Sequence, residues 1–178
     1  LKFRPMKAYR AALLRLDDNR QALYDSDGLL VVGDDGRIAD VGSWQALRER
    51  HANVPVEHLP GRLLAPGFVD MHIHYPQTDV IGSPADGLLP WLENYTFPHE
   101  SRFSDAQHAA ESADFFIEEL LRNGVTSALV FSTSHAASVD ALFSLAEARG
   151  MRLMTGKGLQ DRFCPCLLYT SDAADERS

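Results

Sequence analysis

Short apolar runs separated by turns dominate the first third of the chain. Leu29–Val32 and Arg37–Val41 stand on either side of the sequence GDDG, whose glycines and aspartates favour turn conformations. This pattern predicts a β-hairpin. Ser43 can serve as the N-cap of a short helix in SWQALRER, and GRLLAPG returns as a strand before a turn at Pro66–Gly67. Residues 1–65 are therefore expected to form a small β-sandwich-like domain.

After this turn the pattern changes to alternating strands and helices. Strands are expected at Phe68–His74, Val125–Phe131 and Met151–Thr155. Helices are expected at Leu88–Tyr95 and at Ser138–Arg149. A further helix is expected between them, from a capping box at Ser104–Gln107 to a stop signal at Asn123–Gly124. The resulting order of strand, helix, strand, helix and strand predicts an α/β fold with a parallel sheet and right-handed crossovers.

The length of this second region limits how much of such a fold it can hold. A (β/α)8 TIM barrel needs about 250 residues, and only about 110 follow Pro66, which is enough for three strands. Residues 66–165 are thus expected to be the first β/α units of an incomplete barrel. We expect the chain to be the front part of a larger protein, and Leu1 in place of methionine suggests that residues also precede it.

Composition and charge exclude several classes of protein. The chain has 178 residues, of which 45% are hydrophobic, and this is typical of a soluble globular protein. Its net charge of -8 and the absence of a basic run argue against nucleic acid as a partner. Neither a membrane span nor a signal peptide is visible, so the cytoplasm is the expected location. Cys164 and Cys166, one residue apart, receive no role.

The strand that follows the turn carries two histidines at its end. Because alternate side chains of a strand share a face, Asp70, His72 and His74 point to one side. The other side, expected to face helices, holds Val69, Met71 and Ile73. The last residues of barrel strands lie at the barrel mouth, where two imidazoles can converge on one metal ion. Solvated or hydrogen-bonded histidines remain an alternative, since this spacing alone is a weak signal.

The sequence around these histidines resembles a known family. PGFVDMHIH resembles the metal-binding signature of the amidohydrolase superfamily, whose first barrel strand carries two histidine ligands. HIHYPQTDVIG, WLENYTFPHE, FFIEELLRNGVTSALVF and SVDALF resemble the branch of that superfamily that deaminates guanine. The resemblance extends to about Arg162–Pro165 and so covers most of the chain.

This resemblance implies a site. His72 and His74 would be ligands of Zn²⁺, one ion per subunit, and guanine would be the small-molecule substrate. The residues expected along the guanine pocket are Gln77, Tyr75, Pro76 and, with a weaker claim, Trp91. Gln77 can alternatively be a simple turn residue, and Trp91 a core residue. Asp70 either orients a neighbouring group or is a structural aspartate. Peripheral positions are expected for His99 in a loop, His108 in an exposed helical turn and His135 in a loop.

The implied reaction is hydrolytic deamination of guanine to xanthine and ammonia by a zinc-activated water. The family's other metal ligands and its acid/base residues belong to later strands, so no catalytic acid or base is assigned and the chain alone is expected to be inactive. Dimers are common in the family, which makes a homodimer a candidate assembly. Two alternatives remain: another zinc amidohydrolase, acting on a pyrimidine, triazine or cyclic amide, and a non-catalytic scaffold derived from the barrel.

The final segment departs from the family pattern. Residues 166–178 show neither a helical period nor strand alternation, and they resemble translated vector or adapter sequence. A genuine disordered tail is the alternative. Gly158, Gln160 and Phe163 also differ from the residues that the family usually has.

Overall fold

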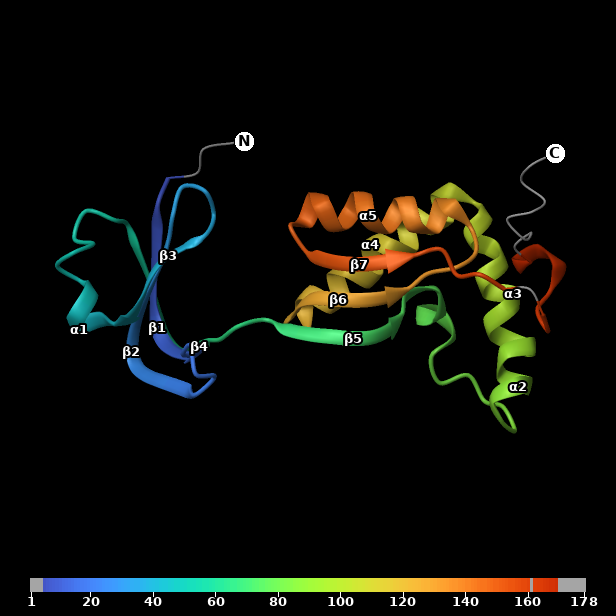
Figure 1. Ribbon diagram of the computed structural model, residues 1–178, viewed down its shortest axis with the longest axis horizontal. Coiled ribbons are helices and arrows are strands. Elements are labelled where there is room, and N and C mark those ends of the chain that lie inside the picture. The colour runs from blue at the N-terminus through green and yellow to red at the C-terminus, as the bar shows by residue number, and fades with distance from the viewer. Residues whose placement is uncertain (1–4, 161, 170–178) are drawn as a thin grey trace. The chain divides into compact units, whose positions relative to one another are not determined.

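The computed structural model describes residues 5–160 and 162–169 of the chain. These form two compact units that meet in sequence at Pro66 and Gly67 (Figure 1). Each unit is described by itself. Leu1 and the end of the expected tail, residues 170–178, lie outside the described residues.

The first unit is one four-stranded sheet with the order β3-β2-β1-β4. Its strands are β1 Lys7–Leu16, β2 Ala22–Val32, β3 Ile38–Ser43 and β4 Val56–Leu64. β2 pairs antiparallel with β1 and β3, whereas β4 pairs parallel with β1. The predicted hairpin is confirmed, because Gly33 donates its backbone N–H to the carbonyl of Arg37 at 2.8 Å. Ser43 caps the short helix α1 Trp44–Leu47, also as predicted.

Only one face of this sheet carries a buried cluster. Ala8, Leu29 and Val31 pack there with Leu47 of α1. Within the described residues of this unit no second sheet covers the opposite face, so the expected sandwich is not confirmed.

The second unit is a three-stranded parallel sheet with the order β5-β6-β7, and long helices connect its strands (Figure 1). The strands are β5 Phe68–His74, β6 Val125–Phe131 and β7 Arg152–Gly156, and the connecting helices are α4 Ala106–Arg122 and α5 Ala136–Arg149. The predicted alternation of strands and helices is confirmed, and the bounds of β5 and β6 agree with those expected from the sequence.

A series of short helical segments links β5 to α4. They are η1 Tyr75–Val80, α2 Leu88–Trp91, the π-helix η2 Leu92–Thr96, α3 Phe97–Glu100 and η3 Ser101–Ser104. The helix expected at Leu88–Tyr95 thus continues to Glu100. Pro98 has no N–H to donate to a carbonyl in the preceding turn, which accounts for a wider π turn just before it.

The start of α4 differs from the expected capping box. Asp105, not Ser104, is the N-cap, and its Oδ1 accepts the backbone N–H groups of Gln107 at 2.7 Å and His108 at 3.1 Å. The Ser104 hydroxyl instead donates to the carbonyl of Ser101. An aspartate at this position satisfies two of the unpaired amides of the first turn, which explains the shift by one residue.

The core of the second unit lies where α4 and α5 pack on the sheet. Ile117 and Leu120 of α4 meet Leu142 of α5 over Ala128 and Val130 of β6. The apolar side of β5 is covered only in part, contrary to expectation. Ile73 packs on this core, whereas Val69 is 61% and Met71 59% exposed, because the described helices lie over β6 and β7.

The beginning of β5 is held close to β6. A side chain at Gly67 would collide with that of Thr126, and Phe68 donates its backbone N–H to the carbonyl of Gly124 at 2.8 Å. Gly124 itself has a φ of 79°, a left-handed conformation that glycine adopts at little cost. These contacts fix the point at which β5 starts to pair.

Beyond β7, Cys166–Leu168 form a short 3-10 helix with a fully buried Leu168, although no helical period was expected there. Cys164 and Cys166 are free thiols. In the described ranges 5–160 and 162–169 no helix combines the length and the apolar character needed to cross a membrane.

Candidate metal centre and base pocket

The two histidines of β5 lie together at the carboxyl end of the sheet. Residues two apart on a strand share a face, so His72 and His74 project to the same side. Phe131, at the end of β6, packs against both imidazoles with ring centroids 4.8 Å from His72 and 4.7 Å from His74. Its ring is nearly parallel to that of His74, with 14° between the planes. Neighbouring strands therefore orient the pair.

The separation of the two imidazoles suits a shared metal ion. The Nε2 atoms of His72 and His74 lie 3.3 Å apart. Two nitrogens bound to one tetrahedral zinc at ~2.05 Å would be separated by ~3.3 Å. Both residues can therefore hold a zinc ion without changing the position of the strand. The described residues contain no group of three or more histidine, cysteine, aspartate or glutamate side chains arranged to hold a metal.

The surroundings of His74 favour its neutral form, which is the form that can bind a metal. Burial, and to a lesser extent the nearby His72, lower the pKa of His74 below its ordinary value, so its neutral form is favoured. Asp70 lies on the same strand, where its Oδ1 accepts the backbone N–H of His72 at 3.0 Å. This contact is one that a structural aspartate makes.

Gln77 connects the histidine pair to a buried carboxyl group. Its Nε2 lies 3.3 Å from His74 Nδ1 and 3.3 Å from Glu100 Oε1. Glu100, at the end of α3, is only 6% exposed. Burial raises the pKa of Glu100, while hydrogen bonds from Gln77 and Gln160 oppose the rise. Sequence reasoning assigned Glu100 no role, although it ends the distinctive segment WLENYTFPHE.

A pocket of about 630 Å³ opens beside these residues. Its walls come from the carboxyl ends of the three strands, the helical segment before α4 and the loop after β7. Residues from these elements include His74, Gln77, Phe97, Glu100, Phe131 and Met154. The volume suits a small heterocycle, since ligand pockets span roughly 300–1,000 Å³.

The other residues expected along the base pocket lie elsewhere. Tyr75 is fully buried in the core, its ring meets that of Phe103 edge-on at 5.1 Å, and its hydroxyl donates to the carbonyl of Ser138 at 3.2 Å. Burial raises the pKa of Tyr75. Pro76 is also fully buried. Trp91 is half-buried in α2, and nearby Leu92 lines the pocket. Their assignment to the base pocket stays a prediction.

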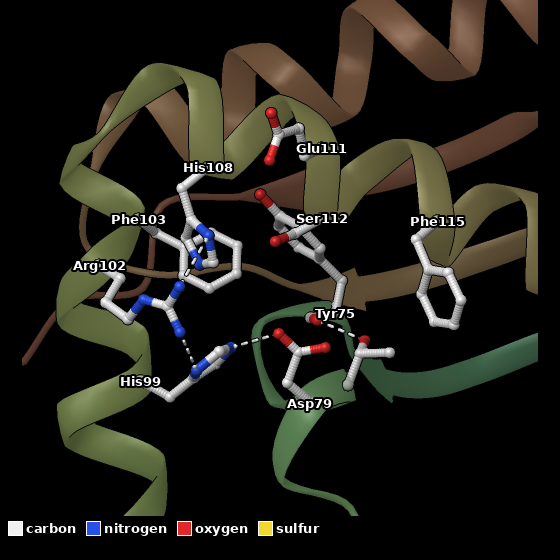
Figure 2. Close-up of a pocket in the computed structure, with 10 residues that line it drawn as sticks. Tyr75, Asp79, His99, Arg102, Phe103, His108, Glu111, Ser112 and Phe115 are labelled. Carbon is white, nitrogen blue, oxygen red and sulfur yellow. Dashed lines mark hydrogen bonds and ion pairs between the residues drawn. The ribbon is translucent and has the colours of Figure 1, made fainter.

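A smaller pocket of about 290 Å³ lies between η1 and α4 (Figure 2). The rings of His99 and His108 meet edge-on there with centroids 5.5 Å apart, and the Arg102 guanidinium donates to Nδ1 of His99 at 3.4 Å and of His108 at 3.5 Å. His99 Nε2 lies 3.4 Å from Asp79 Oδ2. His99 was expected in a loop, but it belongs to α3 and is 8% exposed, because the helix continues past Pro98.

The remaining histidines are more enclosed than expected. His108, in the first turn of α4, is half-buried, and its Nε2 has no hydrogen-bond partner among the described residues. His135 is the N-cap residue of α5 and also has a buried, unpartnered Nε2 in this part of the chain. Neither residue lines the pocket that contains His74.

The fold and the histidine pair are those of a metal-dependent hydrolase. The sequence matches the amidohydrolase family over residues 63–178, and the chain belongs to this family.

Within the family, the chain is similar to guanine deaminases. It is 40% identical over 183 residues to the guanine deaminase of Escherichia coli K12, covering 97% of this chain and 42% of that protein. The crystal structure of guanine deaminase from Bradyrhizobium japonicum superimposes with a TM-score of 0.89 at 32% identity, covering 94% of this chain and 38% of that one.

A third relative has its substrate bound. The guanine deaminase of C. acetobutylicum, with guanine in its active site, gives a TM-score of 0.78 at 32% identity over 93% of this chain and 39% of that one. The chain therefore spans about two fifths of the length of these relatives.

Proposed function

We propose that the protein to which this chain belongs hydrolyses guanine to xanthine and ammonia in a zinc-dependent reaction. The observation that carries the proposal is the 3.3 Å separation of His72 Nε2 and His74 Nε2 beside a pocket of about 630 Å³. The similarity to a guanine deaminase with bound guanine supports the choice of substrate. The donor set supports zinc, because imidazole is among its usual ligands.

Each residue of the site has a specific part in this proposal. His72 and His74 would hold the metal, and Phe131 would keep their rings in position. Bound zinc supplies a nucleophile at neutral pH by lowering the pKa of its water to about 7. Gln77, which lines the pocket next to His74, would bind the edge of the base through its amide. Tyr75, Pro76 and Trp91 stay predicted neighbours of the base rather than contacts.

Further groups are needed for turnover. A catalytic zinc site uses about three protein ligands and a water, and proton transfer to the departing ammonia needs an acid/base residue. We propose that these groups, which the described residues do not supply, come from the part of the protein that corresponds to the rest of its relatives' length. A TIM barrel completed by that part, a cytoplasmic location and a homodimer belong to the same proposal.

The test is to express the complete protein with one equivalent of zinc and to measure xanthine and ammonia formed from guanine. Adenine and cytosine serve as comparison substrates, because each carries an exocyclic amine on a ring whose donors and acceptors are arranged differently from those of guanine. We expect turnover of guanine well above that of either. A zinc-loaded, folded protein that releases no xanthine would refute the assignment of substrate.

A further inference from the structure

Glu100 is a buried carboxyl group at the wall of the pocket. It comes from α3, and it lies among donors that are all neutral amides. Gln77 Nε2 donates to its Oε1 at 3.3 Å, and Gln160 also forms a side-chain hydrogen bond with it. Glu100 has no cationic partner among the described residues, which makes its carboxylate costly to bury, and the two N–H donors reduce that cost. Hydrogen bonding to Glu100 therefore favours the orientation in which both amides point their nitrogen atoms toward the carboxyl group.

The contacts of Gln77 determine which end of its amide is free. A primary amide has two N–H donors on one atom and an acceptor on the other. The Nε2 atom of Gln77 faces both Glu100 Oε1 and His74 Nδ1. The carbonyl oxygen has no hydrogen bond with the described residues, and Gln77 lines the pocket. The acceptor is thus the end left for a ligand.

Metal binding makes Glu100 more important to this arrangement. A histidine that coordinates zinc through Nε2 carries its proton on Nδ1, which then cannot accept from an amide. The Nδ1–H group would then face the Gln77 amide donor at 3.3 Å, and within the described residues Glu100 is the acceptor that can still hold Gln77 Nε2. The orientation of the amide then depends on a residue 23 positions away on α3.

We propose that Glu100 is a positioning residue that holds the nitrogen end of the Gln77 amide, so that the Gln77 carbonyl oxygen accepts from an N–H edge of the bound base. The inference rests on the proposed function and adds which edge of the base the pocket recognises. A pyrimidine or purine that presents a ring N–H beside its exocyclic amine fits this acceptor, and a base with only acceptors on that edge does not.

The test compares Glu100→Gln with Glu93→Gln in the complete, zinc-loaded protein. Glu100→Gln keeps the size of the side chain but removes its charge and leaves one acceptor oxygen for the two amide donors of Gln77 and Gln160. Glu93 is an exposed glutamate of η2 outside the pocket, which makes Glu93→Gln a matched control. We expect Glu100→Gln to raise KM for guanine about tenfold with zinc content unchanged, and Glu93→Gln to leave KM unchanged.

A double substitution separates positioning from a merely structural role. If Glu100 acts through Gln77, the protein with both Gln77→Ala and Glu100→Gln should have the KM of Gln77→Ala alone. Multiplied effects of the two changes, or an unchanged KM in Glu100→Gln, would overturn the inference. Should Glu100→Gln fail to fold, Glu100→Asp keeps the charge at a shorter reach, and an unchanged KM there counts against the inference as well.

Failure of the proposed function has a different signature. If the wild-type protein is inactive toward guanine, the proposed substrate is wrong. Crystal structures of the wild type and of Glu100→Gln then test the role of Glu100 independently. We expect Gln77 to adopt a different side-chain conformation in the variant. An unmoved Gln77 would show that Glu100 does not position it.

Discussion

His72 Nε2 and His74 Nε2 lie 3.3 Å apart, within the range set by one tetrahedral metal ion. This relationship makes the two residues a unit. If the pair holds one ion, as proposed, removing either imidazole would leave the coordination sphere of that ion incomplete.

In the complete protein we therefore expect His72→Ala and His74→Ala each to lower bound zinc well below one per subunit and to reduce guanine turnover by about 100-fold or more. Metal analysis and xanthine formation measure the two effects together. His58→Ala, which changes an exposed histidine of β4, is the control. Normal zinc content and normal turnover in either β5 variant would disprove the metal assignment.

Gln77→Ala should separate base binding from metal binding. The amide would be lost from the pocket while both imidazoles stay, so zinc content should not change. KM for guanine should rise about tenfold, because a buried polar edge of the base loses its partner. Steady-state kinetics with Gln45→Ala, an exposed glutamine of α1, as control check this. Unchanged kinetics would place Gln77 outside the pocket.

Stability should decrease in mild acid because of His99. Burial is the main cause that lowers the pKa of His99 below 6.5, Arg102 and His108 act in the same direction, and Asp79 opposes them. Below pH 6.5 the unfolded chain binds more protons than the folded one, so stability is complete above this value and falls as pH decreases through it.

His99→Gln should make stability depend less on pH, whereas His58→Gln, at an exposed site, should leave the pH dependence unchanged. Thermal unfolding followed between about pH 7.5 and pH 5 measures it. His74 and His135 have pKa values lowered in the same direction, so part of the slope should remain in the His99 variant. A slope identical to that of the wild type would contradict the account.

The two candidate caps of α4 can be distinguished by substitution. Asp105→Ala removes the acceptor of two backbone N–H groups and should measurably reduce the free energy of unfolding. Ser104→Ala should have a much smaller effect, since its hydroxyl lies outside the helix and donates to Ser101. Denaturant unfolding of both variants provides the comparison, and equal losses would argue for a capping box.

Residues 1–178 expressed alone are expected to self-associate and to lack activity. Apolar side chains of the sheet are exposed, with Val69 61%, Met71 59% and Met154 56% accessible to solvent. Uncovered apolar strands associate with one another. Light scattering after size-exclusion chromatography and a guanine assay with added zinc test this. A monomer that forms xanthine would show that the active site is already complete.

The sequence predicted those elements whose signals are local. Alternation and flanking turns were enough to place β5 and β6, and the glycines and aspartates of GDDG were enough for the hairpin. Features that depend on tertiary contacts were missed. The cap moved to Asp105 because Ser104 had another acceptor, and the coverage of Val69 could not be inferred from its apolar character.

The residues of the candidate site likewise divide into those predicted from local signals and those whose contacts depend on the tertiary fold. The convergence of His72 and His74 follows from a spacing of two residues, which is a local property of a strand. The contact of Glu100 with Gln77 joins residues from different elements, and a single sequence contains no signal for such a pair. The resemblance to the family placed Tyr75 along the guanine pocket. Its ring packs in the core of the second unit, which a single sequence does not reveal, and the assignment stays a prediction.

The close approach of Gly67 to Thr126 has a consequence for insertions and deletions. Ile73 and His74 pair with Val130 and Phe131 at the end of β6, and strand side chains alternate, so sliding this end of β5 by one residue would turn His74 toward the helix side. Gly67 lets the start of β5 lie against Thr126, since a larger residue would push the strand away. Gene variants that lengthen or shorten the chain by one residue between Gly67 and His72 should therefore displace the histidine pair from Phe131 and weaken the proposed zinc binding, although both histidines stay in the sequence.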